Sequence, residues 1–154
     1  MITLWPESVR ASEHFLVQDF SCHDEHGTPY PTDKIASVLM PFCGGTLETI
    51  RHFVCGDKFM LVLSGFRTPA WNVHEGGAAD SRHVHGDGAD VWCPPLGLTA
   101  GPALYLAILA LHRAGLLPNL GGLGKYGNRV HVDDRPHEPG GLVVWDNTTN
   151  GARG

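Results

Sequence analysis

The strongest constraint on the fold is one apolar helical pattern set among several short strand-like runs. Residues 99–118, TAGPALYLAILALHRAGLLP, have apolar side chains over a wide helical face, so they predict a helix with Thr99 as N-cap that ends at Gly115 and Pro118. Four short apolar runs are bounded by turn residues, as strands are. They are KFMLVLSG (58–65), GADVWC (88–93), RVHVDD (129–134) and GLVVW (141–145). We therefore predict an α+β fold, with a small antiparallel sheet and helices packed on one side.

Other segments give weaker predictions. Apolar residues at helical spacing over 33–54, interrupted by PFCGG, predict two packed helices. Residues 68–82, TPAWNVHEGGAADSR, mix Pro, Gly and polar residues and predict a long loop. The run 58–65 is expected to be a buried strand, and 129–134 alternates as a half-buried strand does. The tail, residues 146–154, is expected to be frayed.

Composition restricts the class of protein. With 154 residues and 42% apolar content, the chain is expected to form one domain over 1–154, with a core over about 12–145. The net charge of −5 and the lack of a basic cluster argue against nucleic acid as a partner. No apolar run reaches the ~18 residues of a membrane span, and the start MITLWPESVRASEHF does not resemble a signal peptide, so cytoplasmic synthesis is expected.

The four cysteines are spread along the chain without a CxxC pair. They are Cys22, Cys43, Cys55 and Cys93. This spacing argues against a cysteine zinc site and is typical of buried thiols, although it leaves disulfides open.

The histidines suggest a metal site. Ten histidines is a high number for this length, and the stretch SRHVHGDGADVW (81–92) concentrates histidines, aspartates and glycines. Hydrolytic zinc takes three ligands from His and Asp or Glu and keeps one position open. His83 and Asp90 offer a local pair, and His131 is the best distant third ligand, with the carboxylate of Asp133 on the same face of its strand.

A purely structural interpretation of these residues stays open. Two histidines in a glycine-rich loop are often simply solvated, and Asp90 could serve as a turn or cap residue. Asp133 and Asp134 could pair with Arg129 or Arg135 at the surface.

Three motifs together resemble a known family. They are LSGFRTPAWN (63–72), GGAADSRHVHGDGADVW (76–92) and NRVHVDDR (128–135), and SEHFLVQDFSC (12–22) adds a similar start. In this order they resemble the zinc D-Ala-D-Ala carboxypeptidase family of peptidoglycan metallopeptidases, which shares its fold with the hedgehog signalling domain. The match covers roughly residues 12–145.

The resemblance implies roles for particular residues. It makes His83, Asp90 and His131 the ligands of one Zn²⁺ ion, and leaves His85 without a ligand role. It implies that Arg67 holds the substrate or the developing oxyanion. Further residues are expected to shape the substrate site or to support the ligands; they are Ser64, Asn72, Ser81 and Tyr126.

The chain departs from the family pattern where the general base is expected. Several branches have Glu or Asp three residues before the last zinc histidine, and this chain has Asn128, which cannot accept a proton from water. Asp133 is our candidate for the base or for a carboxylate that orients His131, with Tyr126 and Asp87 as weaker candidates. A smaller departure is Gly88, in place of the family's alanine.

The function implied is a zinc-dependent peptidase that cuts peptidoglycan peptides. It would act as a D-Ala-D-Ala carboxypeptidase or as an endolysin-type endopeptidase, and a phage enzyme that reaches the cell wall after release or from the virion would fit. Two alternatives stay open. One is a hedgehog-like zinc-binding module without catalysis. The other is a cupin-type oxygenase or isomerase, since Gly77, His83, His85, Asp90 and Gly97 nearly fit the first cupin motif, although the second motif is missing.

Overall fold

The computed structural model describes residues 9–97 and 99–148, so the extreme start of the chain and the tail 149–154 lie outside the described residues. The helices are α1 (Glu48–Phe53), α2 (Pro69–His74), α3 (Arg82–His85) and α4 (Gly101–Arg113). The strands are β1 (Leu61–Ser64), β2 (Gly88–Trp92), β3 (Gly122–Lys125), β4 (Val130–Asp133) and β5 (Val143–Asp146). None of the helices in these ranges is long and apolar enough to cross a membrane.

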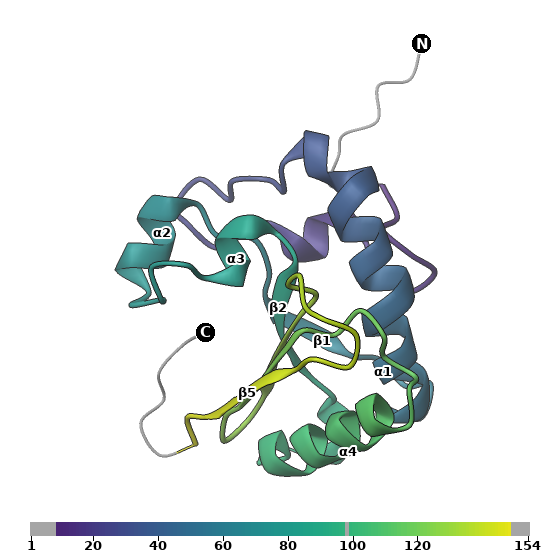
Figure 1. The fold of residues 1–154 in the computed structure, drawn as a ribbon. Helices are drawn as coiled ribbons and strands as arrows, with labels where there is room; N and C mark the ends of the chain where they lie inside the picture. The colour runs from purple at the N-terminus through teal and green to yellow at the C-terminus, as the bar shows by residue number, and fades with distance from the viewer. Residues whose placement is uncertain (1–8, 98, 149–154) are drawn as a thin grey trace.

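The strands form one sheet in the order β1-β2-β4-β3-β5. All neighbours are antiparallel except β3 and β5, which run parallel. The predicted α+β fold is confirmed, and Figure 1 shows α4 lying along the sheet, far from α2 and α3. Strand β3 was missed, because its sequence GLGK lacks the β-branched and aromatic residues that mark strands.

The two faces of the sheet differ in chemistry. One face carries buried apolar side chains that join a single cluster with residues of α4 and of the helical segment before β1; they are Ala89, Val91, Leu123, Val130 and Val132. Because side chains alternate along a strand, the residues between them point to the other face. Those residues are Asp90, Gly122, Gly124, His131 and Asp133. The polar side chains of the sheet thus gather on the face that the apolar core does not use.

Two strands differ from their predicted burial. β4 was expected to be half-buried, but all its residues are buried, since it lies at the centre between β2 and β3. β1 was expected to be buried, but it is an edge strand, and Leu61 is 39% exposed.

The chain over 32–53 forms one helical segment, so the prediction of two helices separated at PFCGG was wrong. Two π-helical turns, Ile35–Leu39 and Phe42–Leu47, flank Pro41 and lead into α1. The amide of Met40 bonds to the carbonyl of Ile35, five residues back. Wider turns of this kind let a helix continue past a proline, which has no amide hydrogen to donate.

The segment 68–82, predicted as a loop, contains α2. Thr68 caps this helix by accepting a hydrogen bond from the amide of Trp71, and Pro69 occupies the first turn. The sequence TPAW carries this N-terminal signal, which we missed.

Helix α4 begins at Gly101, with Ala100 rather than Thr99 as N-cap. The amide of Gly101 donates to the carbonyl of Gly127, and any Cβ at this position would collide with the backbone of Tyr126. This close approach to the β3–β4 turn sets the start of the helix.

The end of the described chain is ordered by hydrogen bonds. Asp146, expected to be frayed, lies in β5 and accepts a hydrogen bond from the Thr148 hydroxyl, while the amide of Asn147 donates to the carbonyl of Lys125.

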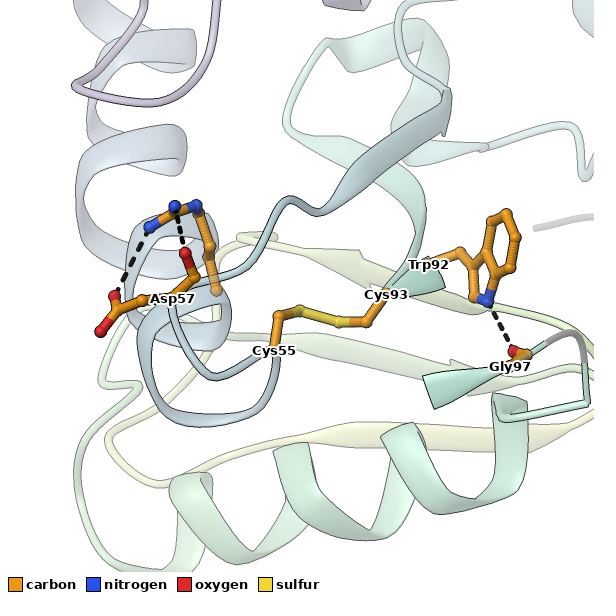
Figure 2. The surroundings of a disulfide bond; sticks show 6 residues. Cys55, Asp57, Trp92, Cys93 and Gly97 are labelled. Carbon is orange, nitrogen blue, oxygen red and sulfur yellow. Dashed lines mark hydrogen bonds and ion pairs between the residues drawn. A yellow bond between two sulfur atoms is a disulfide. The ribbon is translucent and has the colours of Figure 1, made fainter. Parts of the chain in front are cut away.

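A disulfide joins Cys55, in the turn after α1, to Cys93 at the end of β2 (Figure 2). The turn that holds Cys55 includes Asp57, whose carbonyl accepts a hydrogen bond from Arg51. Of the four cysteines expected as buried thiols, Cys22 and Cys43 are buried and free.

Loss of this disulfide should lower the stability of the protein. The bond closes a loop with a sequence separation of 38 residues, for which the chain-entropy model gives a loss of about 3–4 kcal/mol in the free energy of unfolding. We expect urea unfolding of the Cys55→Ser/Cys93→Ser protein to show this loss. A Cys22→Ser protein is the control for changing a buried cysteine that is not cross-linked, and equal stability of the parent and the double variant would contradict the prediction.

Asp134 should make stability depend on pH. Burial, together with the charges of Asp87 and Asp133, raises the pKa of Asp134 to about 7, although a hydrogen bond from Thr46 opposes this. Between about pH 4 and 7 the folded protein keeps this proton and the unfolded chain loses it, so the contribution of Asp134 to the free energy of unfolding falls as pH rises.

The test compares urea unfolding of the parent and Asp134→Asn at pH 4.5, 5.5 and 6.5. The variant should lack a downward slope of at most about 1.4 kcal/mol per pH unit that the parent has. Asp33→Asn, which removes an exposed carboxylate, is the matched control. An identical slope in the parent and Asp134→Asn would show that this proton is not retained on folding.

Candidate metal centre

Three buried side chains bring potential metal ligands together. His83 Nε2 lies 3.2 Å from Asp90 Oδ1, and His131 Nδ1 lies 3.2 Å from the same oxygen. The two nitrogens are 3.3 Å apart. The three atoms thus form a nearly equilateral triangle.

This triangle fits a zinc ion. Ligands at the corners of a tetrahedron around zinc, about 2.0–2.1 Å from the ion, lie about 3.3–3.4 Å apart. Two histidines and one carboxylate are a donor set that zinc takes in catalytic sites, where the fourth position stays open. Among the described residues, this is the group of His, Cys, Asp and Glu side chains close enough to share a metal ion.

The fold brings the ligands together by strand register and a short helix. Asp90 on β2 is directly paired with His131 on β4, so their side chains are neighbours on one face. His83 lies in α3, where the hydroxyl of Ser81 caps the helix by accepting from the His83 amide. Gly86 ends the helix with φ +83°, a conformation that favours glycine, and returns the chain to β2.

Hydrogen bonds orient both rings. His83 Nδ1 lies 2.7 Å from the carbonyl of Gly65, and donation to that carbonyl leaves Nε2 as the ligand atom. His131 Nε2 lies 2.7 Å from Asp133 Oδ2, which leaves Nδ1 as the ligand atom. Such partners of the second ring nitrogen fix the tautomer of a metal-binding histidine.

Asp133 is itself held by an arginine. Arg135 Nε and Nη2 donate to the two Asp133 oxygens at 2.8 and 2.7 Å, and the Arg135 amide adds a third hydrogen bond. Although burial opposes it, these bonds and the one with His131 lower the pKa of Asp133. Its oxygens are occupied, so of the two roles predicted for Asp133 the geometry favours orientation of His131 over proton transfer.

Electrostatics favour the metal-binding protonation state at His83 and Asp90, while His131 must give up a proton to bind a metal. Burial lowers the pKa of His83, which favours the neutral ring that a metal needs. Burial opposes the charged form of His131, but hydrogen bonds with Asp133 and Asp90 raise its pKa. Burial of Asp90 by itself would raise its pKa. The charges and hydrogen bonds of His83 and His131 outweigh this effect and lower the pKa, so the charged carboxylate is favoured.

Glycines make room for this centre. A Cβ at Gly122 would collide with the carboxylate of Asp133, and one at Gly124 with the indole of Trp145. Trp145 from β5 lies against His131, with ring centroids 5.2 Å apart. The absence of side chains at Gly122 and Gly124 therefore makes room for the Asp133 carboxylate and the Trp145 indole on this face of the sheet.

Arg67, expected to hold the substrate or oxyanion, lies beside the centre. Its Nη2 is 3.8 Å from Asp90 Oδ2, and its amide donates to the carbonyl of His83. Asn72 Oδ1 accepts from Arg67 Nη1 at 3.3 Å, and the Asn72 amide group donates to the carbonyl of Ala78. Ser64 ends β1 at the position paired with Asp90. The structure therefore places Arg67 and Ser64 next to Asp90, while Asn72 holds Arg67.

The other candidates for a general base are also engaged. Asp87 is bound by Arg82 through Nε and Nη2 at 2.9 and 2.5 Å. The buried Tyr126 hydroxyl accepts from the indole of Trp145 at 3.3 Å. Asn128 is exposed and accepts a hydrogen bond from Arg129.

His85 does not join the centre, so the cupin alternative was wrong. Its side chain is 46% exposed and its Nε2 lies 2.9 Å from Asp80 Oδ1. His83 and His85 both lie in the four-residue helix α3, where side chains two positions apart point in different directions. The spacing of the motif alone could not show that this segment is helical.

A cavity lies beside the centre instead of over it. Its volume is about 850 Å³, and its walls include Arg82, Asp87, Asp134 and Arg135 but none of the three ligands. The ligand chemistry, and not the size of this cavity, identifies the functional site.

Sequence reasoning missed three contributors to the centre. The Gly65 carbonyl and Trp145 carried no sequence signal, since each acts through a contact between distant segments. Arg135 was predicted to pair with an aspartate at the surface, but the Asp133 it binds is fully buried.

Zinc content should depend on His83, Asp90 and His131 but not on His85. We expect about one zinc per chain in the parent and in His85→Ala, and little or none in His83→Ala, Asp90→Ala or His131→Ala, by elemental analysis of purified protein. Asp133→Asn should keep the site but weaken zinc affinity about 10–100-fold in chelator competition, since it disturbs the orientation of His131. Zinc lost from His85→Ala, or retained in His131→Ala, would contradict this assignment.

Comparisons with known proteins agree with this centre. Residues 13–133 match the family model described as Peptidase M15. The chain is also 41% identical over 54 residues to the zinc D-Ala-D-Ala carboxypeptidase of Streptomyces albus G, which covers 35% of this chain. The match spans only 21% of that relative's length. Since the family model covers most of the chain, including the three candidate ligands, the chain belongs to the M15 peptidase family.

Proposed function

We propose that this protein is a zinc-dependent peptidase that hydrolyses a peptide bond in bacterial cell-wall peptides. One observation carries the proposal. Three buried ligand atoms from His83, Asp90 and His131 stand at tetrahedral spacing, with both rings held by hydrogen bonds. Membership in a peptidase family supports the reaction class.

Each residue around the centre has a separate role in the proposed hydrolysis. A zinc ion held here would polarise the scissile carbonyl and lower the pKa of water to around 7. Asp133 keeps His131 in the tautomer that presents Nδ1, and the Gly65 carbonyl does the same for Nε2 of His83. Arg67, fixed by Asn72, is placed to bind the carbonyl oxygen as it gains negative charge.

The substrate proposed is a peptidoglycan stem peptide. The relative from Streptomyces albus G is named as a D-Ala-D-Ala carboxypeptidase, which favours a terminal D-Ala-D-Ala bond. An internal stem or crosslink bond, as cut by phage endolysins, is the other candidate. The Cys55–Cys93 disulfide supports action outside a reducing compartment.

A second candidate is a zinc-binding module without catalysis. The observation in its favour is that Asn128 stands where an acid is expected, while Asp133 and Asp87 are each bound by an arginine. Such a module would keep its zinc and bind cell-wall peptides without cutting them.

Peptide release from purified peptidoglycan, read by mass spectrometry, tests the proposal. The parent should release fragments whose masses identify the bond, chelation should stop release, and added zinc should restore it. Arg67→Lys should lower kcat about 10²–10³-fold, the size of effect seen when one oxyanion donor is lost. Arg113→Gln, an exposed arginine of α4, is the control. Full zinc occupancy with no fragment released would favour the non-catalytic module.

A further inference from the structure

Arg129 has two buried N–H groups without a hydrogen-bond partner in the part of the chain that the structure describes. These are its Nε and Nη2, while Nη1 donates to Asn128 at 3.0 Å. The side chain is only 13% exposed. Unpaired donors on a buried charged group are costly, so such groups call for a specific explanation.

The guanidinium lies at the metal centre. Its Nε is 3.6 Å from Asp90 Oδ2, which is within ion-pair range but too long for a good hydrogen bond. The other oxygen of Asp90 faces the two histidines. The guanidinium also lies over the ring of Tyr126, 4.3 Å from its centroid. Stacking on this ring and the backbone pairing of Tyr126 with Arg129 hold the side chain in place.

Neither neighbouring carboxylate forms a hydrogen bond with Arg129 Nε or Nη2. Both oxygens of Asp133 are bound by Arg135, and one also contacts His131. Asp90 Oδ2 makes no hydrogen bond among the described residues. Nε and Nη2 form one edge of the guanidinium, and this edge matches a carboxylate through two parallel hydrogen bonds. The geometry therefore suits an anion that comes from outside the chain.

We propose that Arg129 determines specificity by binding a carboxylate of the peptide substrate through Nε and Nη2. The inference rests on the proposed peptidase function. That carboxylate belongs either to the C-terminal residue or to an acidic residue within the peptide, and the experiment distinguishes the two.

The test compares three synthetic stem pentapeptides that end in D-Ala-D-Ala. One has all carboxylates free, one has the terminal carboxylate amidated, and one has the carboxylate of its glutamate amidated. The zinc-loaded parent should show about 10–100-fold higher kcat/KM for the free peptide than for one of the two amides, as expected for charged hydrogen bonds worth about 1.5–3 kcal/mol. The amide that is disfavoured identifies the carboxylate.

Variants then assign this preference to Arg129. Arg129→Gln should lose the preference, mainly by raising KM for the free peptide, while its kinetics on the disfavoured amide stay close to those of the parent. Arg129→Lys keeps the charge without the two-donor edge and should give an intermediate preference. Arg113→Gln should behave as the parent does. Equal kcat/KM of the parent on all three peptides, or an equal loss on all three in Arg129→Gln, would overturn the proposal.

Binding separates this proposal from the proposed catalysis. Isothermal titration calorimetry of the zinc-loaded proteins with the same peptides at low temperature measures affinity whether or not the bond is cut. If the parent cuts no peptide but binds the free form more tightly and Arg129→Gln does not, the peptidase fails and the carboxylate site stands. If the parent cuts peptides and Arg129 affects neither affinity nor preference, the peptidase stands and the carboxylate site fails. Circular dichroism verifies that each variant is folded.

Discussion

The direct pairing of Asp90 with His131 across strands β2 and β4 is the constraint on which the rest of the centre depends. A shift of the register by one residue would turn one of these side chains into the apolar core and bring a valine or alanine to the metal face. The apolar residues on either side of the pair therefore do more than fill the core. Their burial selects the register that puts two ligands next to each other.

The other parts of the centre are arranged around this pair. Helix α3 places His83 next to this pair, and the turn at Gly86 leads from the helix into β2. The carbonyl of Gly65 fixes the ring of His83. On the opposite side, Asp133 and Arg135 fix the ring of His131. The centre thus combines two candidate ligands from the sheet and one from helix α3 with orienting groups from β4 and from the loops next to the sheet, an arrangement that limits how far a ligand atom can move when a metal or a substrate binds.

Much of this fold could be predicted from sequence, since strands β2, β4 and β5 and helix α4 carry strong local patterns. Strand β3 could not, because two of its four residues are glycines, whose lack of a side chain leaves room for Asp133 and Trp145. The continuous helical segment around Pro41 could not be predicted either. Its local sequence indicates a break, but π-helical turns and tertiary packing let the helix continue. The spacing of His83, Asp90 and His131 suggested a metal site, and the resemblance to a family chose among the histidines. The pairing of Arg135 with a buried Asp133, and the burial of Arg129, depend on contacts that no local pattern records.

The position of the disulfide has a consequence for how the protein depends on its metal. Strand β2 holds the candidate ligand Asp90 at its centre, and Cys93 follows directly after its end. Metal binding and the covalent bond both stabilise the state in which this strand is in place, one by mass action and the other by restricting the unfolded chain. A metal-free chain therefore keeps the support of the disulfide next to β2, and a reduced chain with bound metal keeps the support of the ion. The two contributions add in the free energy of unfolding, so either one alone still favours the folded state in which β2 lies between β1 and β4.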